Sequence, residues 1–299
     1  MRKWMKRAGI GFGTLALVLV LSAIAVYAAS EARLNQEFSF AAKPLAVRPD
    51  PSMVTRGEHL ATAIGKCTEC HGPDLGGKVF IENPAFGTLI APNLTGGRGG
   101  ALARYADDAM LERAIRHGIS DAGRGLLIMP SDEYYHLSDA DLAALIAYLR
   151  ALPPVDRELP ASTVGPVARA LYVAGKLPLL TPERVNHTAA REAPAAGVTV
   201  EYGKYLTTVG GCTGCHGPEL AGGPTGEPGK PPAANLTPRG LSGWTEQDFF
   251  NALRKGIKPG GSPIDPFMPW QATAKMTDDE IRAVWMYLKT VPPRDFPGA

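Results

Sequence analysis

A five-residue motif, Cys-x-x-Cys-His, occurs twice in this chain of 299 residues and constrains its fold more than any other feature. The residues concerned are Cys67, Cys70 and His71 in the first half, and Cys212, Cys215 and His216 in the second. Two thiols three positions apart lie on one side of a helical turn, where they can form thioether bonds to the vinyl groups of a haem. The adjacent imidazole can then take one axial position on the iron. The motifs therefore predict two covalently bound haems c.

Paired cysteines also occur in disulfides, zinc sites and thioredoxin-like redox sites. The two motifs account for all four cysteines of the chain, so no thiol remains for a separate disulfide framework. A zinc site would need both pairs to converge on one ion, and a redox pair would not explain why a histidine follows each pair. Haem attachment accounts for every residue of both motifs, and it is the interpretation we favour.

The sixth ligand of each iron has a candidate in each half. Met129-Pro130 and Met268-Pro269 lie 139 residues apart, each shortly before the last predicted helix of its half. Thioether sulfur is a soft ligand, and His/Met ligation closes both axial positions and raises the reduction potential. The shared register and the shared proline favour Met129 and Met268 as iron ligands, although methionine more often fills gaps in a core.

The first 30 residues predict a segment that enters a membrane. Basic residues at positions 2, 3, 6 and 7 precede a charge-free run from Ala8 to Ala29. As a helix this run would span about 33 Å, enough to cross the hydrocarbon core. A cleaved signal peptide is the alternative, but the run exceeds the usual signal core and favours an uncleaved anchor. The basic residues predict a single pass through a bacterial inner membrane, with the rest of the chain in the periplasm.

Each half is expected to contain the same two helices around its motif. One helix leads into the motif and an amphipathic helix ends the half; the ranges are 54–64 and 137–154 in the first half, and 201–209 and 276–293 in the second. Ser138 and Thr277 are the expected N-caps of the last helices, and a double proline ends each of them. The repeat predicts two tandem helical domains.

A glycine occupies the same place in both leading helices, as Gly57 and Gly203. A glycine inside a short helix costs up to about 1 kcal/mol relative to alanine, so its repetition needs a structural reason. Close approach of the last helix of each half is the reason we expect. Tyr148 and Tyr287, on those last helices, are expected to pack in the core near the two crossings.

The remaining histidines have no histidine at the repeat position in the other half, and we expect them away from the irons: His59, His117, His136 and His187. Each axial histidine should donate its other ring N–H to a backbone carbonyl, which fixes the ring. Pro92 and Ala234 are the candidate carbonyls. They precede Asn93 and Asn235, for which a structural role in the loop is expected in preference to glycosylation.

The chain order predicts five segments. They are a membrane anchor at 1–30, a tether at 31–53, haem domains at 54–154 and 200–299, and a Pro/Ala-rich linker at 155–199. An apolar patch in the linker, at 167–180, is expected to form a short helix against a haem domain. Without the four basic residues of the first segment, 27 Lys and Arg face 29 Asp and Glu. No basic patch predicts a nucleic-acid partner.

The motif after a glycine-containing helix, the Met-Pro pair and the last helix with its Tyr-Leu resemble the class I cytochrome c family. The resemblance implies an all-α fold of two tandem domains, to which the N-terminal sequence adds one transmembrane helix. The long gap from His71 to Met129 and the Asn-Leu-Thr loop most resemble the cytochrome c subunits of membrane-bound alcohol and gluconate dehydrogenases. That likeness implies redox partner proteins, namely a dehydrogenase, a quinol-oxidising complex or a terminal oxidase.

These features predict an electron-transfer protein and not an enzyme. Two alternatives stand beside this prediction. A dihaem peroxidase also carries two such motifs, but it needs one iron with an open distal position and an acid-base group, against which the symmetric Met-Pro pairs argue. A haem-based ligand sensor would be indicated by rapid binding of carbon monoxide to the reduced protein.

Overall fold

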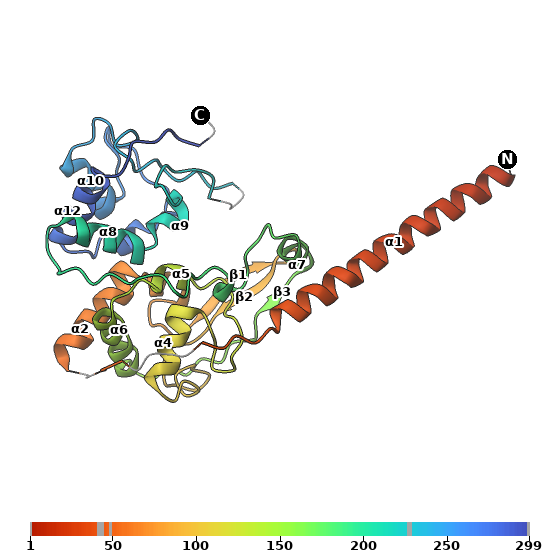
Figure 1. Ribbon diagram of the computed structural model, residues 1–299, viewed down its shortest axis with the longest axis horizontal. Helices are drawn as coiled ribbons and strands as arrows, with labels where there is room; N and C mark the ends of the chain where they lie inside the picture. The colour runs from red at the N-terminus through yellow and green to blue at the C-terminus, as the bar shows by residue number, and fades with distance from the viewer. Residues whose placement is uncertain (1, 41–44, 48–49, 226–228, 298–299) are drawn as a thin grey trace.

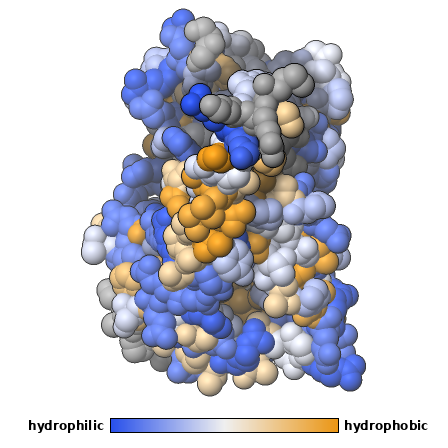
Figure 2. Space-filling view, turned by 90° about the vertical axis from the view of Figure 1, so that its right-hand side faces the viewer, coloured by the Kyte–Doolittle hydropathy of each residue, from blue (hydrophilic) through white to orange (hydrophobic). Residues whose placement is uncertain are grey.

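A long helix projects from a body of two helical units in the computed structural model, which describes residues 2–40, 45–47, 50–225 and 229–297 (Figure 1). This helix, α1 (Arg2–Leu34), exposes its apolar side chains along most of its length. Figure 2 looks onto the side from which α1 projects, and hydrophobic residues gather at the centre of that view. Within the described ranges, α1 alone is long and apolar enough to cross a membrane, a property that signal sequences share.

The N-terminal unit is built around the first motif. Its elements are α2 (Pro51–His59), a π-helical turn (Leu60–Ile64), α3 (Cys67–His71), β1 (Lys78–Asn83), β2 (Gly87–Ala91), α4 (Asp108–His117), α5 (Ser131–Tyr134) and α6 (Asp139–Ala151). The leading helix begins three residues before the predicted start, because the Asp50 side chain accepts a hydrogen bond from the Met53 N–H and Pro51 occupies the first turn. Since α1 also extends to Leu34, residues 35–50 remain of the predicted tether, and 41–44 and 48–49 lie outside the described ranges.

The linker packs on the N-terminal unit and contributes β3 (Thr163–Val164), α7 (Pro166–Val173) and a 3-10 turn (Thr181–Glu183). The short helix expected in the apolar patch is confirmed as α7, but it packs mainly against α1 and not against a haem domain. The C-terminal unit then repeats the helices of the first. Its elements are α8 (Val200–Val209), α9 (Cys212–His216), α10 (Glu246–Lys255), α11 (Trp270–Thr273) and α12 (Asp278–Leu288).

The prediction of an all-α fold is wrong for the N-terminal unit, which contains a three-stranded antiparallel sheet in the order β1-β2-β3. Lys78 pairs with Ala91 across the first two strands, and Thr163 from the linker pairs with Thr88. Residues 78–91 are rich in Val, Ile, Phe and Thr, the types that suit a pleated and half-buried surface. At the corresponding place the C-terminal unit has an isolated bridge instead.

The two glycine crossings are confirmed. A Cβ on Gly57 would lie 2.6 Å from the Cβ of Tyr148 in α6, and a Cβ on Gly203 would lie 2.9 Å from the Cβ of Tyr287 in α12. In both cases it would also overlap a backbone carbonyl of the partner helix. The helices α2 and α6, and likewise α8 and α12, therefore approach more closely than any side chain at these positions would allow.

The predicted N-caps of the last helices are confirmed, with one difference between them. The Ser138 hydroxyl accepts from the N–H of Asp141, and the Thr277 hydroxyl accepts from the N–H of Glu280. Glu280 also accepts from the Thr277 N–H, which completes a capping box. In α6 the Ser138 N–H is donated to the hydroxyl of Tyr205, a residue of the other unit.

Candidate haem sites

The two motif helices share one backbone conformation. Each begins after a residue in the left-handed region, Lys66 (φ 53°) in one case and Gly211 (φ 70°) in the other. Each ends at a glycine with φ near 80°. No disulfide joins any of the four cysteines, so the disulfide alternative is wrong. Burial raises the pKa of all four thiols, for Cys67 to about 12, which does not suit the reactive thiol of a redox pair.

The imidazole of each motif is fixed by a backbone carbonyl, as predicted. His71 Nδ1 lies 2.9 Å from the Pro92 carbonyl oxygen, and His216 Nδ1 lies 2.7 Å from that of Ala234. Because a carbonyl can only accept, each Nδ1 is the protonated nitrogen and each Nε2 carries a free lone pair. Burial lowers the pKa of both imidazoles, which keeps them neutral near pH 7. A neutral imidazole with a free Nε2 fits an axial ligand of haem iron.

The carbonyl loops are held by the repeated Asn-Leu-Thr residues. Asn93 accepts from the N–H and the hydroxyl of Thr95 at 2.9 and 2.8 Å, and its amide donates to the Val155 carbonyl. Asn235 and Thr237 repeat these bonds in the second loop at 2.9 and 2.7 Å. The expected structural role of the two asparagines is confirmed, and it places the carbonyls that orient the histidines.

The two Met-Pro pairs also share one conformation. Pro130 and Pro269 have φ/ψ values of −81°/55° and −77°/56°. The Met129 carbonyl accepts from the Ser131 N–H at 2.9 Å, and the Met268 carbonyl accepts from the Trp270 N–H at 2.7 Å. Both methionines, like Cys67 and Cys212, are partly buried and pack against the hydrophobic core. The common geometry supports equal roles for Met129 and Met268, whose iron ligation stays a prediction.

The other histidines are engaged in contacts of their own. His59 Nε2 lies 2.8 Å from an oxygen of Glu280. His117 Nδ1 lies 2.7 Å from His187 Nδ1, and both rings stack with Phe40. His136 is half-buried just after α5, with its ring edge-on to that of Tyr135.

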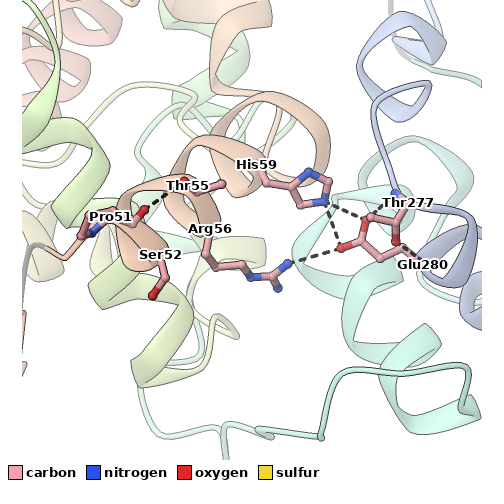
Figure 3. Close-up of a pocket in the computed structure, with 7 residues that line it drawn as sticks. All are labelled: Pro51, Ser52, Thr55, Arg56, His59, Thr277 and Glu280. Atoms are coloured by element: carbon pink, nitrogen blue, oxygen red, sulfur yellow. Dashed lines mark hydrogen bonds and ion pairs between the residues drawn. The ribbon is translucent and has the colours of Figure 1, made fainter.

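The units pack through equivalent surfaces. Arg56 and His59, from α2, converge on Glu280 at the start of α12 (Figure 3). In the reciprocal contact Tyr205, from α8, donates to Asp141 at the start of α6 at 2.7 Å. Since His59 and Tyr205 occupy the same repeat position, as do Asp141 and Glu280, the two contacts are related by an approximate two-fold axis. Arg56 also pairs with Asp141 at 2.9 Å, so it takes part in both contacts between the units.

The two motifs meet at this interface, in a contact that we call the motif junction. The Lys66 ammonium, directly before the first motif, donates to the carbonyl of Gly210, two residues before the second. From α5, the Glu133 carboxylate covers Gly211 and Gly214, where any Cβ would overlap its oxygens. Burial and neighbouring Asp132 raise the pKa of Glu133 to about 7, against the opposing effect of Lys66.

The sequence prediction missed the motif junction. Its signal lay in departures from the repeat: Glu133 stands where the second half has Ala272, and Gly214 stands where the first motif has Glu69. The Glu133 carboxylate occupies the space that the absence of a side chain at Gly214 leaves open. The sequence alone does not show that positions 133 and 214 are close, because only the packing of the two units brings them together.

Two helical units, each with a Cys-x-x-Cys-His helix, a carbonyl-bound imidazole and a Met-Pro loop, define a c-type cytochrome with two haems. The family model described as cytochrome c matches residues 54–153 and 200–292. The chain belongs to the cytochrome c family.

Relatives with curated names agree with this membership. A diheme cytochrome c-type protein of Cereibacter sphaeroides is 30% identical over 281 residues, covering 82% of this chain and 90% of the relative. The cytochrome c subunit of a quinone alcohol dehydrogenase of Gluconacetobacter polyoxogenes is 29% identical, over 87% of this chain and 62% of the relative. One of the nicotinate dehydrogenase subunits of Pseudomonas putida is 30% identical over 80% of this chain, but the match spans 21% of that relative.

The predicted class of protein and its cofactors follow from these findings. The chain is an electron-transfer cytochrome with two covalently bound haems c. The resemblance to cytochrome c subunits of dehydrogenases is confirmed, since subunits of alcohol, fructose and gluconate dehydrogenases are among its relatives. The chain spans between about half and two thirds of the length of these subunits.

Proposed function

We propose that the chain relays single electrons through two haems attached at the two motifs. The residues that would hold them are Cys67, Cys70, His71 and Met129 in the N-terminal unit, and Cys212, Cys215, His216 and Met268 in the C-terminal unit. A bound haem supplies the one-electron chemistry by cycling its iron between the ferric and ferrous states. The cysteines would attach it, the histidine and the methionine would bind its iron, and the surrounding side chains would shield it from water.

The observation that carries this proposal is the pair of imidazole–carbonyl hydrogen bonds, at 2.9 Å for His71 and 2.7 Å for His216. Each bond fixes both the tautomer and the orientation of a neutral ring whose other nitrogen is free. An orienting hydrogen bond of this kind is typical of histidines that bind metal. Its repetition in two independent loops, each held by an Asn-Thr pair, favours two equivalent sites.

Electrons pass between the two haems within one chain in this proposal. Support comes from the motif junction, where Lys66 donates to the Gly210 carbonyl and Glu133 covers the start of the second motif. The motifs therefore adjoin each other through a few residues. A fixed junction also keeps the relative position of the two sites constant, which the ion pair of Arg56 with Glu280 and the hydrogen bond between His59 and Glu280 reinforce.

The proposed setting is a bacterial inner membrane, with α1 as a single-pass anchor and both units in the periplasm. The charge-free length of α1 and the basic residues before it support this orientation. We propose a membrane-bound dehydrogenase as electron donor, because several relatives bear the names of dehydrogenase cytochrome subunits. A quinol-oxidising complex or a terminal oxidase would be the other partner.

Replacement of the two methionines one at a time tests the site assignment. Met129→Leu and Met268→Leu keep the apolar volume but remove the sulfur, so each variant should show one high-spin haem that binds carbon monoxide rapidly. Met276→Leu is the matched control, because Met276 is a buried core residue on no Met-Pro loop. If both variants keep the optical spectrum of the control, the assigned methionines are not ligands.

A further inference from the structure

The exposed face of α7 carries no polar side chain. The helix buries Ala168 and Tyr172 against the body of the protein. On its opposite face lie apolar residues at helical spacing, and they continue into the C-cap: Pro166, Val167, Ala170, Val173 and Ala174. The two valines are 42% and 38% exposed. A helix on the surface of a soluble protein normally exposes charged or polar residues to water. An exposed apolar face therefore indicates contact with another protein or with a membrane.

Figure 1 shows α7 beside the end of α1 that enters the body. Two arginines connect these helices, one from each. The Arg169 guanidinium lies 4.4 Å above the Tyr27 ring, pairs with Glu31 at 2.9 Å and donates to Ser30 at 2.8 Å. Arg33 makes the return contact, 4.2 Å above the ring of Tyr172 on α7. These paired contacts hold α7 against α1.

The β1–β2 turn extends the apolar surface beyond the start of α7. The Val167 N–H donates to the Ala85 carbonyl at 3.0 Å, and the Gly165 N–H donates to the Phe86 carbonyl at 2.9 Å. The Phe86 side chain is itself 38% exposed. The backbone of Phe86, whose aromatic side chain is partly exposed, therefore adjoins the first residues of α7.

The depth of α7 along α1 is set by Tyr27. The charge-free run of α1 ends at Ala29, so Tyr27 lies where a membrane-spanning helix would leave the hydrocarbon core. Tyrosine is enriched at that level of a bilayer. Because Arg169 covers the Tyr27 ring, α7 lies at the same level. Lys176, exposed just after α7, adds a positive charge suited to lipid phosphates.

We propose that Phe86, Pro166, Val167, Ala170, Val173 and Ala174 form a membrane seat, a surface that lies in the headgroup region of the bilayer that α1 crosses. The proposal rests on α1 being a membrane anchor, as proposed above. A helix of this kind buries its apolar face at the boundary between headgroups and acyl chains. The seat holds the N-terminal unit in one orientation on the membrane, where a membrane-bound redox partner would meet it.

Tryptophan fluorescence of the full-length holoprotein in vesicles tests the membrane seat. The vesicles contain phosphatidylcholine and phosphatidylglycerol, with plain or brominated acyl chains that quench nearby indoles. Val173→Trp is compared with Val198→Trp, a matched control, because both valines are 38% exposed but Val198 lies just before α8. We expect brominated lipid to remove about half of the emission added at position 173, given an insertion of about 5–10 Å, and little of that added at 198.

Equal responses at positions 173 and 198 would overturn the seat. Emission at 173 that is blue-shifted but insensitive to brominated lipid would also overturn it, in favour of a protein partner. The wild-type chain separates this failure from failure of the anchor, because native Trp4 lies on α1. Wild-type emission that brominated lipid leaves unchanged would overturn both the anchor and the seat, whereas the haem spectrum reports the electron-relay function independently.

Discussion

Substitution of Gly203 by alanine should destabilise the protein, although alanine is the better helix former. Alanine gains about 1 kcal/mol over glycine inside an ordinary helix. At this position its Cβ would overlap the Ala283 carbonyl and lie 2.9 Å from the Tyr287 Cβ, against a normal carbon–carbon contact of about 3.5–4.0 Å. The obstacle is mainly backbone, which cannot rotate away, so α8 and α12 must separate.

The expected net effect follows from these opposing contributions. Overpacking of a well-packed contact costs about 1–3 kcal/mol and occasionally more. Because the obstacle is rigid, we expect the upper end of that range and a net loss of about 1–2 kcal/mol in the free energy of unfolding. For a domain of this size 1 kcal/mol changes Tm by about 4–8 °C, so Gly203→Ala should lower Tm by about 5–15 °C.

Thermal unfolding of the holoprotein, followed by circular dichroism and by haem absorbance, measures this change. Gly96→Ala is the control, because a Cβ there meets nothing within 4 Å and its φ is not positive. Gly57→Ala should repeat the effect in the N-terminal unit. A Gly203→Ala protein that is as stable as wild type, or more stable, would refute the close-approach explanation of both glycines.

Three further substitutions address the haem sites and the motif junction. Cys212→Ala should leave at most one normally attached haem by mass spectrometry, and two intact attachments would contradict the assignment. Met129→His should lower one reduction potential by more than about 100 mV, and an unchanged redox titration would mean that Met129 is not a ligand. Burial raises the pKa of Glu133 from 4.5 to about 7, so the folded state loses stability as pH rises through that window. The free energy of unfolding of Glu133→Gln should therefore rise relative to that of wild type between pH 5 and pH 8, by up to about 2 kcal/mol after a discount for partial exposure. A difference in Tm between the two proteins that is independent of pH would contradict a buried carboxylate.

Repetition explains what the sequence could predict. The helices, their caps, the glycine crossings and the carbonyl partners of His71 and His216 each occur once per half. A pattern that arises by chance in one half would not recur at the same position in the other. Local rules of helix capping and periodicity then fix the elements. The start of α2 differs from the prediction because it is set by Asp50 and Pro51, which have no counterpart in the repeat.

Features that join different parts of the chain were not predictable in the same way. The β1–β2–β3 sheet takes its third strand from the linker, where Thr163 pairs with Thr88 from 75 residues away in the sequence. The motif junction joins Glu133 to glycines of the other unit, and the membrane seat depends on Arg169 meeting Tyr27. In each case the decisive contact is tertiary, and neither propensity nor spacing carries information about it.

The central claim is that each of two haem irons is closed by a histidine and a methionine, so that the chain transfers electrons and does not bind a substrate at iron. Electron paramagnetic resonance of the fully oxidised protein tests it most directly. We expect two low-spin ferric signals of equal intensity and no high-spin signal. A high-spin ferric signal from either haem in the resting protein would mean an open or weakly held axial position, and would contradict the account.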